Sequence, residues 1–285
     1  MSLAVRIIPR IDIKGPNLVK GVYLEGLRVL GKPEEFAKYY YENGADELIY
    51  QDVVASLYER NSLHDIISKT AKEVFIPLTV GGGIRNIEDI SNILRAGADK
   101  VSINTAAIEN PSFIKKASRK FGASTIVIAI EAIRQPDGTY MAFTDNGRNY
   151  TGKEAVSWAK EVESLGAGEI LLTSVDQEGS GDGLNIDLIS QISDSISIPV
   201  VAHGGTGKLS HVSDLFAKVP VSGVAIASLF HYDYISMNRN TDGYEKEGNI
   251  DFLKSNRILS TIQPSTINGL KKYLKDKNIS CRVNE

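Results

Sequence analysis

The sequence has little of what marks secreted, membrane or nucleic-acid-binding proteins. Its 285 residues include a single cysteine, Cys281, which excludes an internal disulfide and a cysteine-based zinc site. No run of about 20 apolar residues is present to span a bilayer. Lys and Arg total 32 against 35 Asp and Glu, so the net charge of −3 gives no field that would attract nucleic acid. The chain runs from Met1 straight into a strand-like stretch without a signal peptide, and we expect a cytoplasmic protein.

What the sequence does contain is an alternation of short apolar runs with amphipathic helical segments. The strand-like runs are 5–13, 47–53, 76–80, 100–104, 125–131, 169–173, 198–202 and 224–227. The helical segments are 33–42, 62–74, 87–96, 111–121, 152–165, 186–193, 209–217 and 265–276. Eight strand–helix units predict an α/β fold, a closed (β/α)8 TIM barrel, rather than an open doubly wound sheet. The glycine pattern of a dinucleotide-binding fold is absent after the first strand.

An internal repeat supports the barrel. The segment GADEL at 44–48 recurs as GAGEI at 166–170, and IPLTVGGG at 76–83 recurs as IPVVAHGG at 198–205. The sequence therefore consists of two similar four-unit halves. They form one closed barrel, because a half barrel would leave two open edges. We expect a single domain over 1–285, with a polar insert at about 233–264 after the eighth strand that acts as a substrate lid or a mobile loop.

Two glycine-rich loops follow the third and seventh strands, at the end of the barrel where phosphate binds in this fold. Backbone without Cβ atoms lets several N–H groups converge on an anion. Tight turns that need positive φ are the plainer interpretation, but two such loops half a barrel apart favour phosphate sites. The residues expected to bind phosphate are Gly82, Gly83, Asn104 and Thr105 at one site and Gly204, Gly205, Ala227 and Ser228 at the other.

Alternation along the first strand places Arg6, Arg10 and Asp12 on its inward face. Asp12 then lies at the top of the barrel, and Glu131 occupies the same level on the opposite strand. We expect this pair to be catalytic, in general acid–base work on the middle of a bisphosphorylated substrate. The alternative is a pair of rim carboxylates that cap loops.

The lower end of the barrel is also charged. The first inward residues of four strands are Arg6, Glu47, Lys100 and Glu169, which together form a neutral ring. Such a ring is either a plug that stabilises the fold or a gate for a small neutral molecule. The four histidines fit no metal template, and we expect neither a metal nor a cofactor. His203, at the exit of the seventh strand, is the one expected in the site.

Three stretches, 71–85, 95–104 and 158–174, closely resemble the HisF family, the cyclase subunit of imidazole glycerol phosphate synthase; the resemblance extends over 3–232 and 266–283. It implies a HisH-type glutaminase partner on the bottom face and ammonia passing up the barrel axis. It also implies a bisphosphorylated aminoimidazole-carboxamide ribonucleotide as substrate. Asp12 matches the first of the family's two catalytic aspartates, and the ring of Arg6, Glu47, Lys100 and Glu169 matches its ammonia gate.

The departures from the family pattern cluster at the top of the barrel. Glu131 replaces the second aspartate, Arg10 replaces a small or thiol residue, Gln51 replaces an apolar residue and His203 replaces a serine. Further residues expected to contact substrate or tune the site are Lys20, Asp52, Thr173 and Asp176.

A buried guanidinium needs a partner, so we expect Arg10 to pair with Asp12, Glu131 or both and to hold them ionised. That would favour a base over an acid and weaken activity on the histidine-pathway substrate. Two alternatives remain open. One is a paralogue that supplies ammonia for amidination of a surface-polysaccharide sugar, and the other is a non-catalytic phospholigand-binding activator of a glutaminase.

Overall fold

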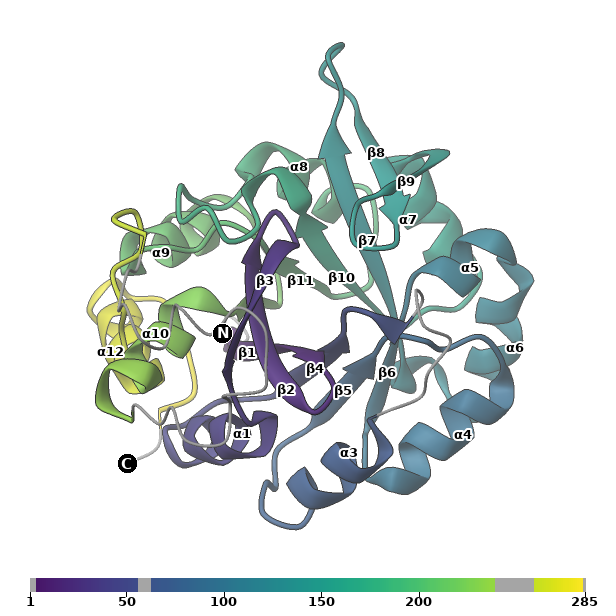
Figure 1. The fold of residues 1–285 in the computed structure, drawn as a ribbon. Helices are drawn as coiled ribbons and strands as arrows, with labels where there is room; N and C mark the ends of the chain where they lie inside the picture. The colour runs from purple at the N-terminus through teal and green to yellow at the C-terminus, as the bar shows by residue number, and fades with distance from the viewer. Residues whose placement is uncertain (1–3, 56–62, 239–258, 284–285) are drawn as a thin grey trace.

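Eight parallel strands close into a barrel in the computed structural model, which describes residues 4–55, 63–238 and 259–283 (Figure 1). The barrel strands are β1 (Arg6–Lys14), β4 (Leu48–Asp52), β5 (Leu78–Gly81), β6 (Lys100–Ile103), β7 (Ile126–Arg134), β10 (Glu169–Ser174), β11 (Val200–His203) and β12 (Gly223–Ile226). They follow one another around the wall, and the pairing of β7 with β10 completes the circle. The predicted (β/α)8 fold and all eight predicted strands are confirmed.

Helices form the outer layer. They are α1 (Pro33–Glu42), α3 (His64–Thr70), α4 (Ile87–Ala96), α5 (Thr105–Glu109), α6 (Ser112–Phe121), α7 (Ala155–Ser164), α8 (Ile186–Ser193), α9 (Leu209–Lys218), α10 (Ser228–Met237) and α12 (Ile267–Asp276), with 3-10 turns at Ala123–Thr125 and Val175–Gln177. Local signals fix their ends: α4 begins at a capping box of Asn86 and Asp89 and ends at Gly97, whose φ is 119°. None of the described helices is long and apolar enough to cross a membrane.

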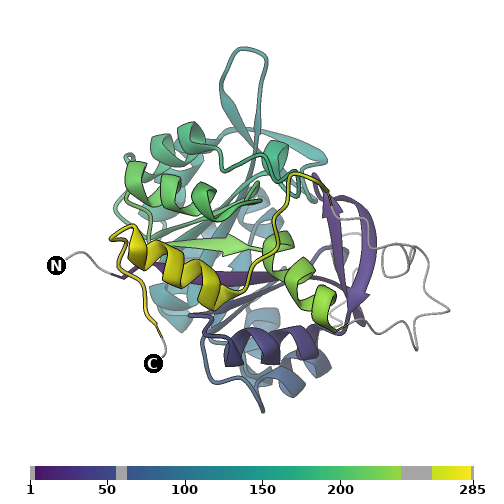
Figure 2. The same cartoon turned by 90° about the vertical axis from the view of Figure 1, so that its left-hand side faces the viewer.

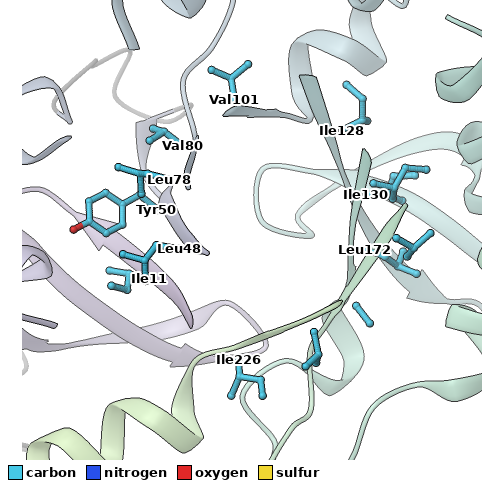
Figure 3. Close-up of a cluster of buried hydrophobic side chains, with 14 of the residues drawn as sticks. Ile11, Leu48, Tyr50, Leu78, Val80, Val101, Ile128, Ile130, Leu172 and Ile226 are labelled. Carbon is cyan, nitrogen blue, oxygen red and sulfur yellow. The ribbon is translucent and has the colours of Figure 1, made fainter. Parts of the chain in front are cut away.

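The main core lies between the barrel wall and the helices. Outward-facing strand residues such as Ile11, Tyr50 and Ile130 are fully buried there, and Figure 3 shows them arranged around the wall. A second, smaller core fills the barrel interior. Its members are Ile8, Ile49, Val127, Leu171, Val201 and Ala225. This apolar layer separates the charged lower end of the barrel from the polar residues at the top.

Two hairpins that the sequence did not signal rise from the carboxyl end of the barrel. One joins β2 (Asn17–Val22) to β3 (Glu25–Gly31), and the other joins β8 (Tyr140–Thr144) to β9 (Asn149–Glu154). The predicted helix 152–165 was wrong at its start, because 149–154 pair with β8 and α7 begins only at Ala155. Figure 2 shows the first hairpin at one end of the barrel and the start of β1 at the other.

The predicted insert at 233–264 is corrected at its start. Residues 233–237 belong to α10, a helix that buries Leu229, Phe230, His231, Tyr232 and Ile235. Because buried residues lie on all sides of this helix, the sequence has no amphipathic periodicity from which the helix could be predicted. Of the rest of the predicted insert, 239–258 lie outside the described residues.

A buried ion pair holds the last helix against the bottom of the barrel. The Lys271 ammonium of α12 donates to Asp46 Oδ1 at 2.7 Å, and Lys271 is only 1% exposed. The other oxygen of Asp46 accepts from the Ile7 backbone N–H at 2.8 Å. One carboxylate thus joins α12, the α1–β4 loop and β1.

We predict that Asp46→Ala lowers the free energy of unfolding by about 3–5 kcal/mol, because it leaves the Lys271 ammonium buried without a counter-charge. Urea denaturation measures the loss. Glu73→Ala is the control, since it removes an ion pair with Lys38 whose side chains are more than half exposed. Equal midpoints for the two variants would contradict the structural importance of the pair.

Candidate active site

The four charged residues at the lower end form a closed ring. Arg6 Nη1 lies 2.8 Å from Glu47, and Lys100 Nζ lies 3.0 Å from Glu47 and 3.1 Å from Glu169. Arg6 also pairs with Glu169. Each cation thus bridges both carboxylates. The sequence placed these four side chains together through strand alternation alone, and the structure brings them together as predicted.

Arg10 crosses the barrel interior above the apolar layer. Its Nε donates to Asp12 Oδ1 at 2.9 Å, and its Nη1 donates to Thr173 Oγ1, on β10, at 3.2 Å. Arg10 is 3% exposed and Asp12 is 2% exposed. Burial alone would raise the pKa of Asp12, but the nearby charges of Arg10 and Lys20 outweigh it, so the net shift of that pKa is downward. The expected Arg10–Asp12 pair is confirmed, and Asp12 is ionised.

Glu131 behaves differently. It lies beside Thr173 in the strand register, and its Oε2 accepts from the Gly147 N–H of the β8–β9 turn at 3.0 Å. Burial raises the pKa of Glu131 to about 7, although the Arg10 charge and the Gly147 N–H oppose the shift. The expectation that Arg10 holds this carboxyl ionised is therefore wrong, because desolvation exceeds the attraction of a guanidinium already paired with Asp12.

The first glycine loop borders an open cavity of about 360 Å³. Gly82, Gly83, Asn104 and Thr105 line it together, as the sequence predicted, and Glu131 lies in its wall. Asn104 Oδ1 is buried and has no partner among the described residues. Gly82 also has a structural reason to be glycine, since a Cβ there would lie 2.4 Å from the Asp52 carbonyl oxygen. Arg85, absent from the predicted site, adds a positive charge to the wall.

The second glycine loop has the same backbone but almost no space. Gly204, Gly205, Ala227 and Ser228 do lie together, around a cavity of about 10 Å³. A Cβ on Gly204 would lie 2.5 Å from the Ser174 carbonyl oxygen, which repeats the relation of Gly82 to Asp52. The His203 side chain lines this space, and its Nδ1 lies 2.9 Å from the Ala225 carbonyl oxygen.

A residue that the sequence did not single out, Glu178, joins the β2–β3 hairpin to the site. Its carboxylate pairs with Lys20, and both side chains are at most 2% exposed. Glu178 Oε2 also accepts from the Leu24 N–H at 3.1 Å, and its carbonyl oxygen accepts from the Tyr23 N–H at 2.7 Å. Tyr23 and Leu24 have φ of 54° and 61°, so these contacts hold a strained turn. No local sequence pattern signals a contact over this separation.

Three further residues that the sequence predicted to tune the site lie in different parts of the upper end of the barrel. Gln51 neighbours Asp12 in the register and lies over Gly81, where a Cβ would meet its Oε1 at 2.4 Å. Asp52 lines the open cavity and accepts from the Val54 N–H at 3.0 Å. Asp176 accepts from the Arg134 N–H at 2.7 Å, so it braces the end of β7.

The fold and the site define a (β/α)8 barrel with two buried carboxyl groups, Asp12 and Glu131, on the carboxyl-terminal parts of its strands. A family model described as "Histidine biosynthesis protein" matches residues 6–236. The chain is 58% identical over 205 residues to the imidazole glycerol phosphate synthase subunit HisF of Legionella pneumophila, covering 72% of this chain and 97% of that protein. The chain therefore belongs to the histidine biosynthesis protein family, within its HisF group.

We predict that Glu131 makes the protein less stable as pH rises. Its folded-state pKa of about 7 lies above the ordinary 4.5, so its contribution is complete below pH 4.5 and is lost as pH rises through 7. Unfolding free energies measured from pH 5 to 8 should fall in the wild type by more than in Glu131→Gln. Glu25→Gln is the control, because its hydrogen bond from Arg148 lowers the pKa of that carboxyl. Parallel profiles for wild type and Glu131→Gln would refute the raised pKa.

Proposed function

We propose that this chain is an ammonia-dependent synthase subunit that acts on a phosphorylated small molecule at the top of the barrel. A glutaminase of the HisH type at the bottom face would supply the ammonia. The observation that carries the proposal is that one barrel holds the charged ring at its lower end and the two buried carboxylates at its upper end, with the apolar layer and Arg10 between them. The similarity to a HisF subunit supports the same assignment.

The proposed chemistry divides between the two carboxyl groups. When ammonia replaces a carbonyl oxygen, two protons leave the nitrogen in turn and two reach the oxygen, which departs as water. Asp12, whose pKa is lowered, is the base that accepts the first proton. Glu131, whose pKa lies at about 7, is protonated in a substantial fraction of molecules at neutral pH and donates a proton to the oxygen, which gives a carbinolamine. As the hydroxyl then leaves as water, Asp12 gives its proton to that oxygen and Glu131 takes the second proton from the nitrogen, so both groups return to their starting states. A longer acid than the family's aspartate can thus still serve as the acid.

The bottom face supports a protein partner. A cavity of about 810 Å³ opens beside the charged ring, and its walls include the apolar residues Ile196, Ile198 and Phe216. Phe75, in the loop that leads into β5 at the same end, is 75% exposed. Exposed aromatic side chains of this kind are typical anchors of protein interfaces. A glutaminase seated here would release ammonia directly over the ring.

Two alternatives follow from particular residues. The departures at Arg10, Gln51, Glu131 and His203 all lie around the reacting position, which favours a substrate other than the histidine-pathway ribonucleotide, such as a surface-polysaccharide sugar that is amidinated. A non-catalytic activator of the glutaminase is the other alternative, and the buried Asp12 argues against it. We also propose a cytoplasmic location, where the single cysteine stays reduced.

We predict that ammonium salts alone sustain turnover of the bisphosphorylated aminoimidazole-carboxamide ribonucleotide, and that Asp12→Asn lowers kcat by about 100-fold or more by removing the base. Asp194→Asn, at the end of α8, is the matched control and should keep full activity. Product formation is measured without a glutaminase. Undiminished turnover in Asp12→Asn would remove the catalytic role of Asp12, and no turnover in the wild type would favour one of the two alternatives.

We predict that the purified chain binds its cognate glutaminase at micromolar concentration and that Phe75→Ala weakens the complex about tenfold, as loss of an interface anchor does. Calorimetry measures both dissociation constants. Tyr150→Ala is the matched control, since Tyr150 is 61% exposed on β9 at the opposite end of the barrel. If Tyr150→Ala weakens the complex and Phe75→Ala does not, the partner binds at the top of the barrel and the proposed bottom-face interface is contradicted.

A further inference from the structure

The two halves of the barrel carry equivalent rows of residues at the level of the two carboxyl groups. In the first half, the strand register links four positions in order, namely Asp12, Gln51, Gly81 and Ser102. In the second half, it links Glu131, Thr173, His203 and Ala225 in the same order. The first row thus has a long amide side chain on β4 and no side chain on β5, whereas the second has a short hydroxyl on β10 and a ring on β11.

The Gln51 side chain lies over Gly81 and has hydrogen-bonding capacity to spare. A Cβ on Gly81 would lie 2.4 Å from Gln51 Oε1, so the missing side chain on β5 leaves room for this amide. Gln51 lines the open cavity of about 360 Å³, and its side chain takes part in none of the hydrogen bonds among the described residues. Its counterpart Thr173 already accepts from Arg10 Nη1 at 3.2 Å. The Gln51 amide therefore offers an acceptor and two donor hydrogens to a ligand.

A second polar group in the same wall also lacks a partner. Ser102 lies on the other side of Gly81, where a Cβ on that glycine would lie 3.0 Å from Ser102 Cβ. Ser102 lines the same cavity and is 3% exposed, and its Oγ is buried with no hydrogen-bond partner among the described residues. Leaving a buried hydroxyl unpaired costs free energy, which a bound polar group recovers. In the barrel wall, these two groups flank β5 between the strands of Asp12 and Glu131.

The charges near Gln51 favour a neutral ligand group at this place. Asp12, which is ionised, is the register neighbour of Gln51 and disfavours an anion. Arg10 bonds that same carboxylate, so a cation would lie near its guanidinium. An anion is better placed at the first glycine loop, where Arg85 adds a positive charge to the cavity wall. A hydroxyl or a carboxamide both donates and accepts, which matches an amide and a hydroxyl side by side.

We propose that Gln51 is a specificity-determining residue that binds a neutral hydroxyl or carboxamide group in the middle of the substrate, with Ser102 as the second partner of that group. This inference rests on the proposed function and deepens it, because it states what the substrate carries between its phosphates. It agrees with the bisphosphorylated aminoimidazole-carboxamide ribonucleotide, whose hydroxyls and carboxamide are neutral.

Two ligands of equal length and charge test the contact. Ribitol 1,5-bisphosphate carries hydroxyls between its phosphates, and pentane-1,5-diol bisphosphate carries none. Calorimetry should show that wild type binds the ribitol compound about tenfold more tightly, and that Gln51→Leu, which keeps the size of the side chain, binds the two alike. Gln191→Leu is the matched control, because Gln191 is an exposed glutamine on α8, and it should keep the tenfold preference.

Equal affinities in wild type, or an undiminished preference in Gln51→Leu, would overturn the proposal and leave the proposed function standing. If wild type binds neither bisphosphate, the proposed function fails and this inference fails with it. The two failures are therefore distinguishable.

Ser102→Ala separates a binding contact from a structural one. Because the Ser102 hydroxyl has no partner among the described residues, its removal should leave the urea midpoint unchanged while it reduces the preference for the ribitol compound. Ser213→Ala is the control with the opposite pattern, since that hydroxyl donates to the Ser210 carbonyl oxygen at 2.9 Å. It should lower the midpoint and keep the preference. A full tenfold preference in Ser102→Ala would contradict the proposal, even if Gln51→Leu fails to fold.

Discussion

The guanidinium of Arg10 is the constraint around which the upper half of the barrel is organised. Arginine stays protonated in proteins, so a fully buried one must be surrounded by acceptors. Asp12 and Thr173 take its hydrogen bonds, and Glu178 and Glu131 add their charges from further away. The same charge acts on every titratable group nearby. It keeps Asp12 ionised, limits the rise in the pKa of Glu131 and disfavours a proton on His203.

The twofold repeat gives the two half barrels the same backbone at their glycine loops but different side chains around those loops. Gly82 and Gly204 each approach the exit of the preceding barrel strand so closely that a Cβ would lie 2.4 or 2.5 Å from a carbonyl oxygen. These glycines are therefore required by packing, whatever the loops bind. The side chains one residue earlier differ, because the Gln51 amide covers Gly81, whereas the His203 imidazole lines the space at the second loop.

The sequence predicted what depends on local period and missed what depends on distant contacts. Strand alternation was enough to place Arg6 and Asp12 inside the barrel at opposite ends, and the repeat identified the glycine loops. The β2–β3 hairpin was not predicted, because its turn is formed by Tyr23 and Leu24 at positive φ and not by a glycine-rich turn motif. Glu178, some 150 positions away, stabilises this turn. The protonation state of Glu131 could not be predicted, because burial and four partly cancelling interactions decide its pKa, and none of these is visible along the chain.

The polarity of the barrel axis explains why both carboxylates are needed in the proposed reaction. A cation entering from the bottom would pass the charged ring, then an apolar layer that cannot solvate it, and then the positive charge of Arg10. Ammonium is disfavoured at the last two steps, whereas neutral ammonia is not. Nitrogen that arrives neutral must shed a proton only after it adds to carbon, which requires an ionised base at that point. The departing oxygen requires a protonated acid. Arg10 bonds directly to Asp12 and acts on Glu131 only through its field, so one buried charge leaves the two carboxyl groups in these different states.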